Sequence, residues 1–215
     1  MINKIGVMQG RLLHKYQGRY QAHPLGYWQE EFDIAKNVGL DCIEFILDYN
    51  DAEKNPLLKA GGAYEIIAIS AKTGVTVTSI CADYFMEAPL HSTDEAVAEQ
   101  SLKVLKKLLE TSSLIGVTDI VIPCVDQSTL DGIEAVERFV SKISTIIPVI
   151  EDKRINLSLE TDLAPQPFVE LLERLNSKRF TVNYDIGNSA ALGYDSVEEL
   201  DAYGSKITDI HIKDR

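Results

Sequence analysis

The chain has 215 residues, of which 45% are hydrophobic and 25% are charged, a composition typical of one folded domain. Its formal net charge of −12 opposes binding to nucleic-acid phosphates, and no apolar run approaches the roughly 18 residues of a membrane span. The N-terminal segment lacks the features of a signal peptide, so we expect a cytoplasmic protein. Cys42, Cys81 and Cys124 are widely spaced in apolar segments, which predicts buried free thiols.

Seven short apolar segments rich in isoleucine, valine and threonine predict β-strands. We expect these strands at residues 4–9, 41–47, 75–81, 119–124, 155–161, 180–186 and 207–213.

Amphipathic segments between the strands predict helices, because their apolar residues repeat at helical spacing. The third predicted helix has a candidate capping box at Ser92 and Glu95 and a stop signal at Gly116. The other signals are Trp28, Phe32 and Ala35 for the first helix, a weaker pattern around 61–73 for the second, residues 133–147 for the fourth, Pro167 and Phe168 to Leu175 for the fifth, and residues around 196–203 for the sixth.

Strands that alternate with helices predict a parallel sheet with helical crossovers. An open doubly wound sheet and a (β/α)8 barrel both fit this order. The first strand is followed by MQGRLL rather than a glycine-rich dinucleotide turn, and the strand spacing is nearly uniform, so the barrel is favoured. We therefore predict one α/β domain over residues 1–215, of the TIM-barrel type, although a barrel needs one strand more than the seven predicted.

Polar residues alternate with apolar ones along the last three predicted strands, which places one polar side chain at the tip of each. These are Glu160, Asp185 and His211, spaced about one strand–helix unit apart. Each has an ordinary structural explanation: Glu160 as a helix cap or a partner of Lys213, Asp185 as a turn residue, and His211 as a hydrogen-bonded interior histidine. Together they are costly to bury without a ligand, so we predict a divalent-metal site at the C-terminal rim.

Three motifs carry a family resemblance: SLETD (158–162), NYDIGNS (183–189) and DIHIKDR (209–215). In this order and spacing they resemble the sugar phosphate isomerase/epimerase group of xylose-isomerase-like TIM barrels. IGVMQGRL (5–12) and DCIEFILD (41–48) are similar as well, so the resemblance extends over nearly the whole chain. Members of that family carry a further helix, strand and helix, so the resemblance implies a barrel truncated after the seventh strand.

The resemblance also implies an activity: isomerase or 3-epimerase of a sugar or sugar phosphate, by proton transfer through an enediolate. One divalent metal ion would be held by Glu160, Asp185 and His211, with Mn²⁺ preferred and Mg²⁺, Co²⁺ or Zn²⁺ as alternatives. Glu160 would be the catalytic residue, and the family's fourth ligand, a second glutamate, belongs to the eighth strand. Arg215 matches a substrate-contacting arginine, and Asn188 stands where some relatives place a histidine near the substrate.

Further candidates for contact with the substrate are Lys213 and Glu44, at inward strand positions, and Asp83, after the third strand. Glu44 could equally pair with a nearby basic residue. The long segment after the first strand could hold a phosphate, cover the substrate, or be an ordinary solvated loop; its basic residues are Arg11, His14, Lys15, Arg19 and His23.

Three alternatives to the isomerase share this fold. An inosose-type dehydratase of the same fold would share the metal and the first proton abstraction. An apurinic-site endonuclease would need more than the four histidines present and a basic surface, so it is disfavoured. An inactive truncated barrel that acts only as a binding or structural module is the third. The unpaired edges of the first and last strands predict a homo-oligomer, and we expect neither nucleic acid nor a membrane as a partner.

Overall fold

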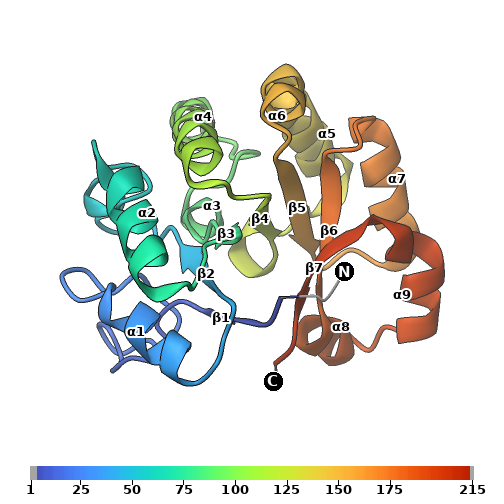
Figure 1. Ribbon diagram of the computed structural model, residues 1–215. Coiled ribbons are helices and arrows are strands. Elements are labelled where there is room, and N and C mark those ends of the chain that lie inside the picture. Colours follow the sequence, from blue (N-terminus) through green and yellow to red (C-terminus); the bar gives the residue numbers. More distant parts are fainter. Residues whose placement is uncertain (1–3, 214–215) are drawn as a thin grey trace.

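The computed structural model describes residues 4–213 and contains a single parallel sheet with the strands in sequence order (Figure 1). The strands are β1 (Gly6–Met8), β2 (Cys42–Ile46), β3 (Ser79–Cys81), β4 (Asp119–Cys124), β5 (Asn156–Thr161), β6 (Phe180–Asp185) and β7 (Ile207–His211). Every neighbouring pair is parallel, as helical crossovers require. The prediction of a TIM-barrel-type α/β fold is confirmed. No ladder joins β1 to β7 within the described range.

Helices cover the outer side of the curved sheet (Figure 1). The α-helices are α1 (Glu30–Asn37), α2 (Gly62–Thr73), α3 (Tyr84–Glu87), α4 (Glu95–Ile115), α5 (Gly132–Ile143), α6 (Ile147–Lys153), α7 (Pro165–Leu175), α8 (Ile186–Leu192) and α9 (Ser196–Tyr203). Short 3₁₀ turns, η1 (Ala52–Lys54), η2 (Asp126–Ser128), η3 (Ser144–Ile146) and η4 (Gly204–Lys206), connect some of them. No described helix is long and apolar enough to cross a bilayer.

Several predicted boundaries were wrong. Strand β3 is only three residues long, because residues 75–78 meet β2 through a single bridge between Cys42 and Thr76. Helix α4 is capped by Asp94, whose carboxylate accepts from the backbone N–H of Ala96, and not by the predicted capping box. The predicted fourth helix is divided into α5, η3 and α6, and Pro148 lies in the first turn of α6. Helices α3 and α8 were not predicted.

The main core lies between the sheet and the helices, where the apolar stripes of the helices pack on the outward side chains of the strands. A smaller apolar cluster consists of Ile46, Cys81 and Val121, with Met8 packed against it. Each of the strands β1 to β4 contributes one of these residues. All three cysteines are buried free thiols, as predicted.

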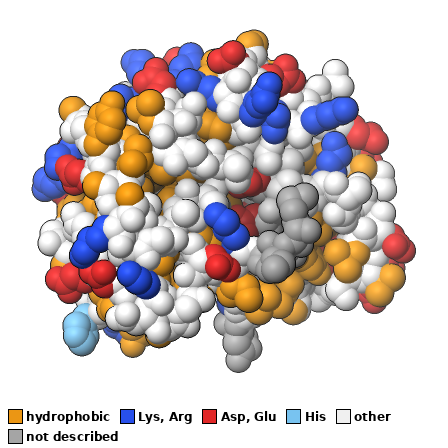
Figure 2. Space-filling model, in the orientation of Figure 1, with side chains coloured by type: hydrophobic (Ala, Val, Ile, Leu, Met, Phe, Trp, Pro, Cys, Tyr) orange, Lys and Arg blue, Asp and Glu red, His pale blue; other side chains and the backbone are white. Residues whose placement is uncertain are grey.

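The outward side of β7 departs from the expected packing on helices. Ile210 is 54% exposed and Ile212 is 83% exposed. Figure 2 shows hydrophobic side chains gathered on this face of the molecule, near the C-terminal end of the described chain. Within residues 4–213, therefore, the helices leave both isoleucines uncovered.

Candidate active site

The three strand-end residues converge inside the curved sheet. Glu160 lies next to the last residue of β5, Asp185 is the last residue of β6 and His211 is the last residue of β7. One possible ligand atom from each lies within 4.8 Å of the others. The imidazole Nδ1 of His211 is 3.9 Å from Glu160 Oε2 and 3.8 Å from Asp185 Oδ2. The carboxyl ends of parallel strands share one rim, which is why residues so far apart in sequence meet.

Two asparagine amides hold the carboxylate of Glu160. Asn183, on β6, donates to Oε2 at 2.9 Å, and Asn188, on α8, donates to Oε1 at 2.5 Å. Burial raises the pKa of Glu160, and the positive charge of His211 opposes that rise. Glu160 is thus a fixed carboxylate whose proton affinity is increased.

Asp185 has a structural role as well as a place in the cluster. It is the N-cap of α8, and its Oδ1 accepts from the backbone N–H of Asn188 at 2.9 Å. Its Oδ2 lies 2.6 Å from Lys213 Nζ. Burial alone would raise the pKa of Asp185, but the nearby positive groups of His211 and Lys213 outweigh burial and hold it at about 2. Asp185 therefore stays ionised beside a carboxylate that binds protons more readily.

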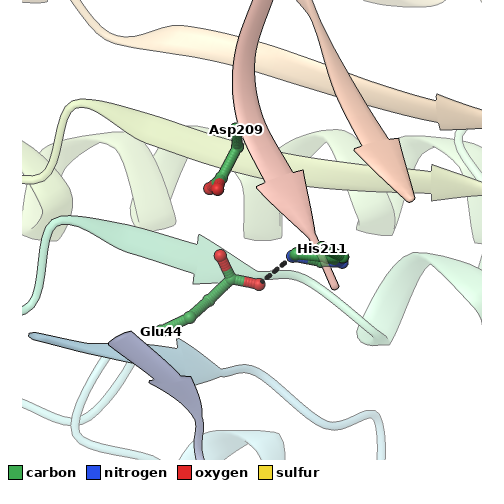
Figure 3. Close-up of side chains that lie close together, drawn as sticks. All are labelled: Glu44, Asp209 and His211. Atoms are coloured by element: carbon green, nitrogen blue, oxygen red, sulfur yellow. Dashed lines mark hydrogen bonds and ion pairs between the residues drawn. The ribbon is translucent and has the colours of Figure 1, made fainter. Parts of the chain in front are cut away.

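His211 connects this cluster to strand β2, which is not a neighbour of β7 in the described sheet. Its Nε2 lies 2.9 Å from Oε1 of Glu44 on β2, and Figure 3 shows the two groups facing each other with Asp209 nearby. Burial lowers the pKa of His211, yet the carboxylate of Asp185 and the hydrogen-bonded carboxylate of Glu44 raise it to about 11. Burial raises the pKa of Asp209 to about 7, and the negative charge of Glu44 adds to this rise. The surroundings of the ring thus strongly favour its protonated, positively charged form.

The donor set fits a divalent metal ion. Two carboxylates and one imidazole are ligands that Mn²⁺, Mg²⁺, Co²⁺ and Zn²⁺ accept. A second group, Glu44, Asp209 and His211, also brings three ligand atoms within 4.8 Å of one another and shares the imidazole with the first group. Strand alternation and spacing predicted that Glu160, Asp185 and His211 would lie together, and the structure brings them together.

The other predicted site residues take different positions. Asn188 and Lys213 contact the two carboxylates, and Glu44 contacts the imidazole. Asp83 follows β3, and its carboxylate accepts from Gln21 Nε2 at 3.4 Å and from the Cys81 thiol at 3.1 Å, not from a residue of the three-residue cluster. Arg215 lies outside the described residues.

The segment after β1 is held by two carboxylates that lie outside it, Glu31 of α1 and Asp48 after β2. Glu31, in the first turn of α1, is fully buried and accepts the backbone N–H groups of Gly10 and Leu12 at 2.8–3.1 Å. Arg19 forms an ion pair with Asp48 at 2.9 Å. Sequence reasoning missed Glu31, which looks like any acidic residue in a first helical turn.

His23 lies in the same segment and is buried. Burial lowers its pKa to about 4, so near neutral pH it adds no positive charge to the segment. A phosphate held by this segment would therefore gain no charge pairing from His23.

Sequence reasoning also gave no role to Asn183 and Ser79. Asn183 was visible as an inward polar residue, whereas the contact between Ser79 and Glu44 depends on the β2–β3 neighbourhood, which the sequence does not specify.

Comparison with known proteins places this geometry in a family. The family model of the xylose isomerase-like TIM barrel matches residues 32–215. The putative L-ribulose-5-phosphate 3-epimerase SgbU of Escherichia coli K12 is 28% identical over 196 residues, covering 87% of this chain and 68% of that protein. L-ribulose-5-phosphate 3-epimerase UlaE of Salmonella paratyphi A is 27% identical over 201 residues, with the same shares covered.

Solved structures agree on the fold. D-psicose 3-epimerase in the presence of D-fructose superposes with a TM-score of 0.77 at 14% identity, covering 97% of this chain and 72% of that one. The IOLI protein with a bound zinc atom gives a TM-score of 0.73 at 18% identity, covering 98% and 72%. With the strand order and the family match together, the chain belongs to the xylose isomerase-like TIM barrel family.

Proposed function

We propose that this chain is a divalent-metal-dependent sugar isomerase, specifically a 3-epimerase of a ketose or ketose phosphate. The observation that carries the proposal is the convergence of Glu160, Asp185 and His211 at the tips of three neighbouring strands. It is supported by the sequence relatives in Escherichia coli and Salmonella, which are named L-ribulose-5-phosphate 3-epimerases. We propose a location in the cytoplasm, where sugar phosphates are handled.

In this proposal Glu160, Asp185 and His211 hold the metal ion, with Mn²⁺ as the preferred ion. The ion would supply a Lewis acid that stabilises negative charge on the substrate's carbonyl oxygen. Asp185, with a pKa of about 2, remains an anion throughout the neutral pH range. Lys213, beside Asp185, would contact an oxygen of the substrate.

The proton is moved by Glu160. Its carboxylate takes the proton from the carbon next to the carbonyl, which leaves an enediolate, and a proton delivered from water to the opposite face of that carbon gives the epimer, while Glu160 releases its proton to solvent. The asparagine amides on both oxygens of Glu160 fix the direction of the carboxylate, and burial increases its proton affinity. Both features favour a general base.

Product analysis by NMR tests the proposal. The purified chain is incubated with Mn²⁺ and a panel of free and phosphorylated pentuloses and hexuloses. We expect a C3 epimer from at least one ketose, and none with chelator or in Glu160→Gln. Glu199→Gln, which alters a buried carboxylate held by Tyr184 and Tyr203 instead, is the matched control and should retain activity.

Two other results would contradict the proposal. A dehydrated product would identify a lyase of the same fold. Absence of turnover with every ketose, with Mn²⁺ bound, would refute the epimerase assignment.

A further inference from the structure

We propose that Glu44 is a positioning residue, which holds the His211 ring so that Nδ1 faces Glu160 and Asp185. The inference rests on the metal-binding part of the proposed function. It assigns Glu44 to the imidazole rather than to the sugar hydroxyl that its inward strand position also suggests.

The geometry of the ring carries the inference. Nε2 lies 2.9 Å from Glu44 Oε1. Nδ1, on the other side of the ring, lies 3.1 Å from the Asn183 amide nitrogen and faces the carboxylates of Glu160 and Asp185 at 3.8–3.9 Å. A histidine that binds a metal through one nitrogen usually donates its other N–H to a carboxylate or carbonyl. Glu44 is placed to accept that N–H, as the dashed contact in Figure 3 shows.

Glu44 is itself held in place. Its second oxygen, Oε2, accepts the hydroxyl of Ser79 on β3 at 2.6 Å, and the residue is only 8% exposed. With one oxygen held by Ser79, the carboxylate has little freedom to turn away from the ring. A hydrogen bond of this kind fixes both the tautomer and the orientation of a ligating imidazole.

The contact also spans the open side of the sheet. Strand β7 pairs only with β6 in the described chain, and β2 pairs with β1 and β3. The bond between Glu44 and His211 therefore connects two strands that share no backbone hydrogen bonds. It fixes the tip of β7 at the point where His211 must meet the carboxylates of β5 and β6.

Calorimetric titration with Mn²⁺ provides the first test. We expect Glu44→Ala to weaken Mn²⁺ binding by about 10- to 100-fold, the usual effect of losing such a partner. Glu44→Gln keeps an oxygen acceptor and should lose less affinity. Glu199→Gln, the matched buried carboxylate, should bind as the parent does.

Three results would overturn the proposal. Affinity within about twofold of the parent in Glu44→Ala would show that the ring needs no support. Abolished binding in both Glu44 variants would make Glu44 a ligand, as in the group with Asp209. Unchanged Mn²⁺ affinity together with a raised KM for the sugar would make it a substrate contact.

A metal-free measurement separates this inference from the proposed function. In the parent we expect a downfield His211 ring proton on Nε2, protected from exchange by Glu44, in ¹H–¹⁵N NMR spectra. The resonance should persist in Glu199→Gln and be lost in Glu44→Ala. If the parent binds no Mn²⁺ but shows this proton, the metal-dependent function fails while Glu44 still holds the ring. If the protected proton is absent from the parent, the positioning role is refuted.

Discussion

Buried His23 predicts a loss of stability in mild acid. Its ring packs beside both Trp28 and Phe45, with centroid distances of 6.1 and 5.2 Å, and burial lowers its pKa from 6.5 to about 4. Below pH 6.5 the unfolded chain therefore takes up a proton that the folded chain resists. The stabilisation is fully present above pH 6.5 and is lost as the pH falls toward 4.

The difference between these pKa values corresponds to about 3 kcal/mol in total, of which roughly 2 kcal/mol falls between pH 7.5 and pH 5. Urea unfolding at both pH values measures it as the difference between the parent and His23→Gln, which does not titrate. His14→Gln, at an exposed histidine, is the control and should follow the parent. The reasoning is refuted if the parent and His23→Gln lose the same stability on acidification.

Three further predictions concern Glu31, Lys213 and Ile212. Glu31→Gln should lower the free energy of unfolding by roughly 2–4 kcal/mol in urea, because the amide NH₂ that replaces one carboxylate oxygen cannot accept the backbone N–H of Gly10 and faces it as a second donor. A loss below about 1 kcal/mol would contradict this. Lys213→Met should strengthen Mn²⁺ binding about five- to tenfold in calorimetry, since the ammonium competes for Asp185, and unchanged affinity would disprove competition. Because Ile212 is exposed, sedimentation velocity should show self-association of the parent and a monomer for Ile212→Asp. A monomeric parent would exclude self-association through Ile210 and Ile212.

The fold was predictable because its signals are local. Strands β4, β5 and β6 follow the runs of isoleucine, valine and leucine to within one residue, and α9 begins and ends where its pattern indicates. Helix α8 was missed because it is short and its first turn reads as the Ile-Gly-Asn turn after Asp185. The uncovered isoleucines of β7 were missed because alternation predicts which side a residue faces, not what lies there.

The candidate site was predictable only in part. Strand alternation places Glu160, Asp185 and His211 on the inner side at similar height, and this was enough to group them. The contact between Glu44 and His211 joins residues 167 positions apart on strands that do not pair, so it depends on the curvature of the whole sheet. No local pattern in the sequence carries that information.

The most direct test of proton transfer by this site is solvent exchange. A ketose that the parent epimerises is incubated in D₂O with Mn²⁺, and the C3–H signal is followed by NMR. The account predicts deuterium at C3 in both epimers, with incorporation abolished in Glu160→Gln and retained in Glu199→Gln. Epimerisation without deuterium at C3, or unchanged incorporation in Glu160→Gln, would contradict it.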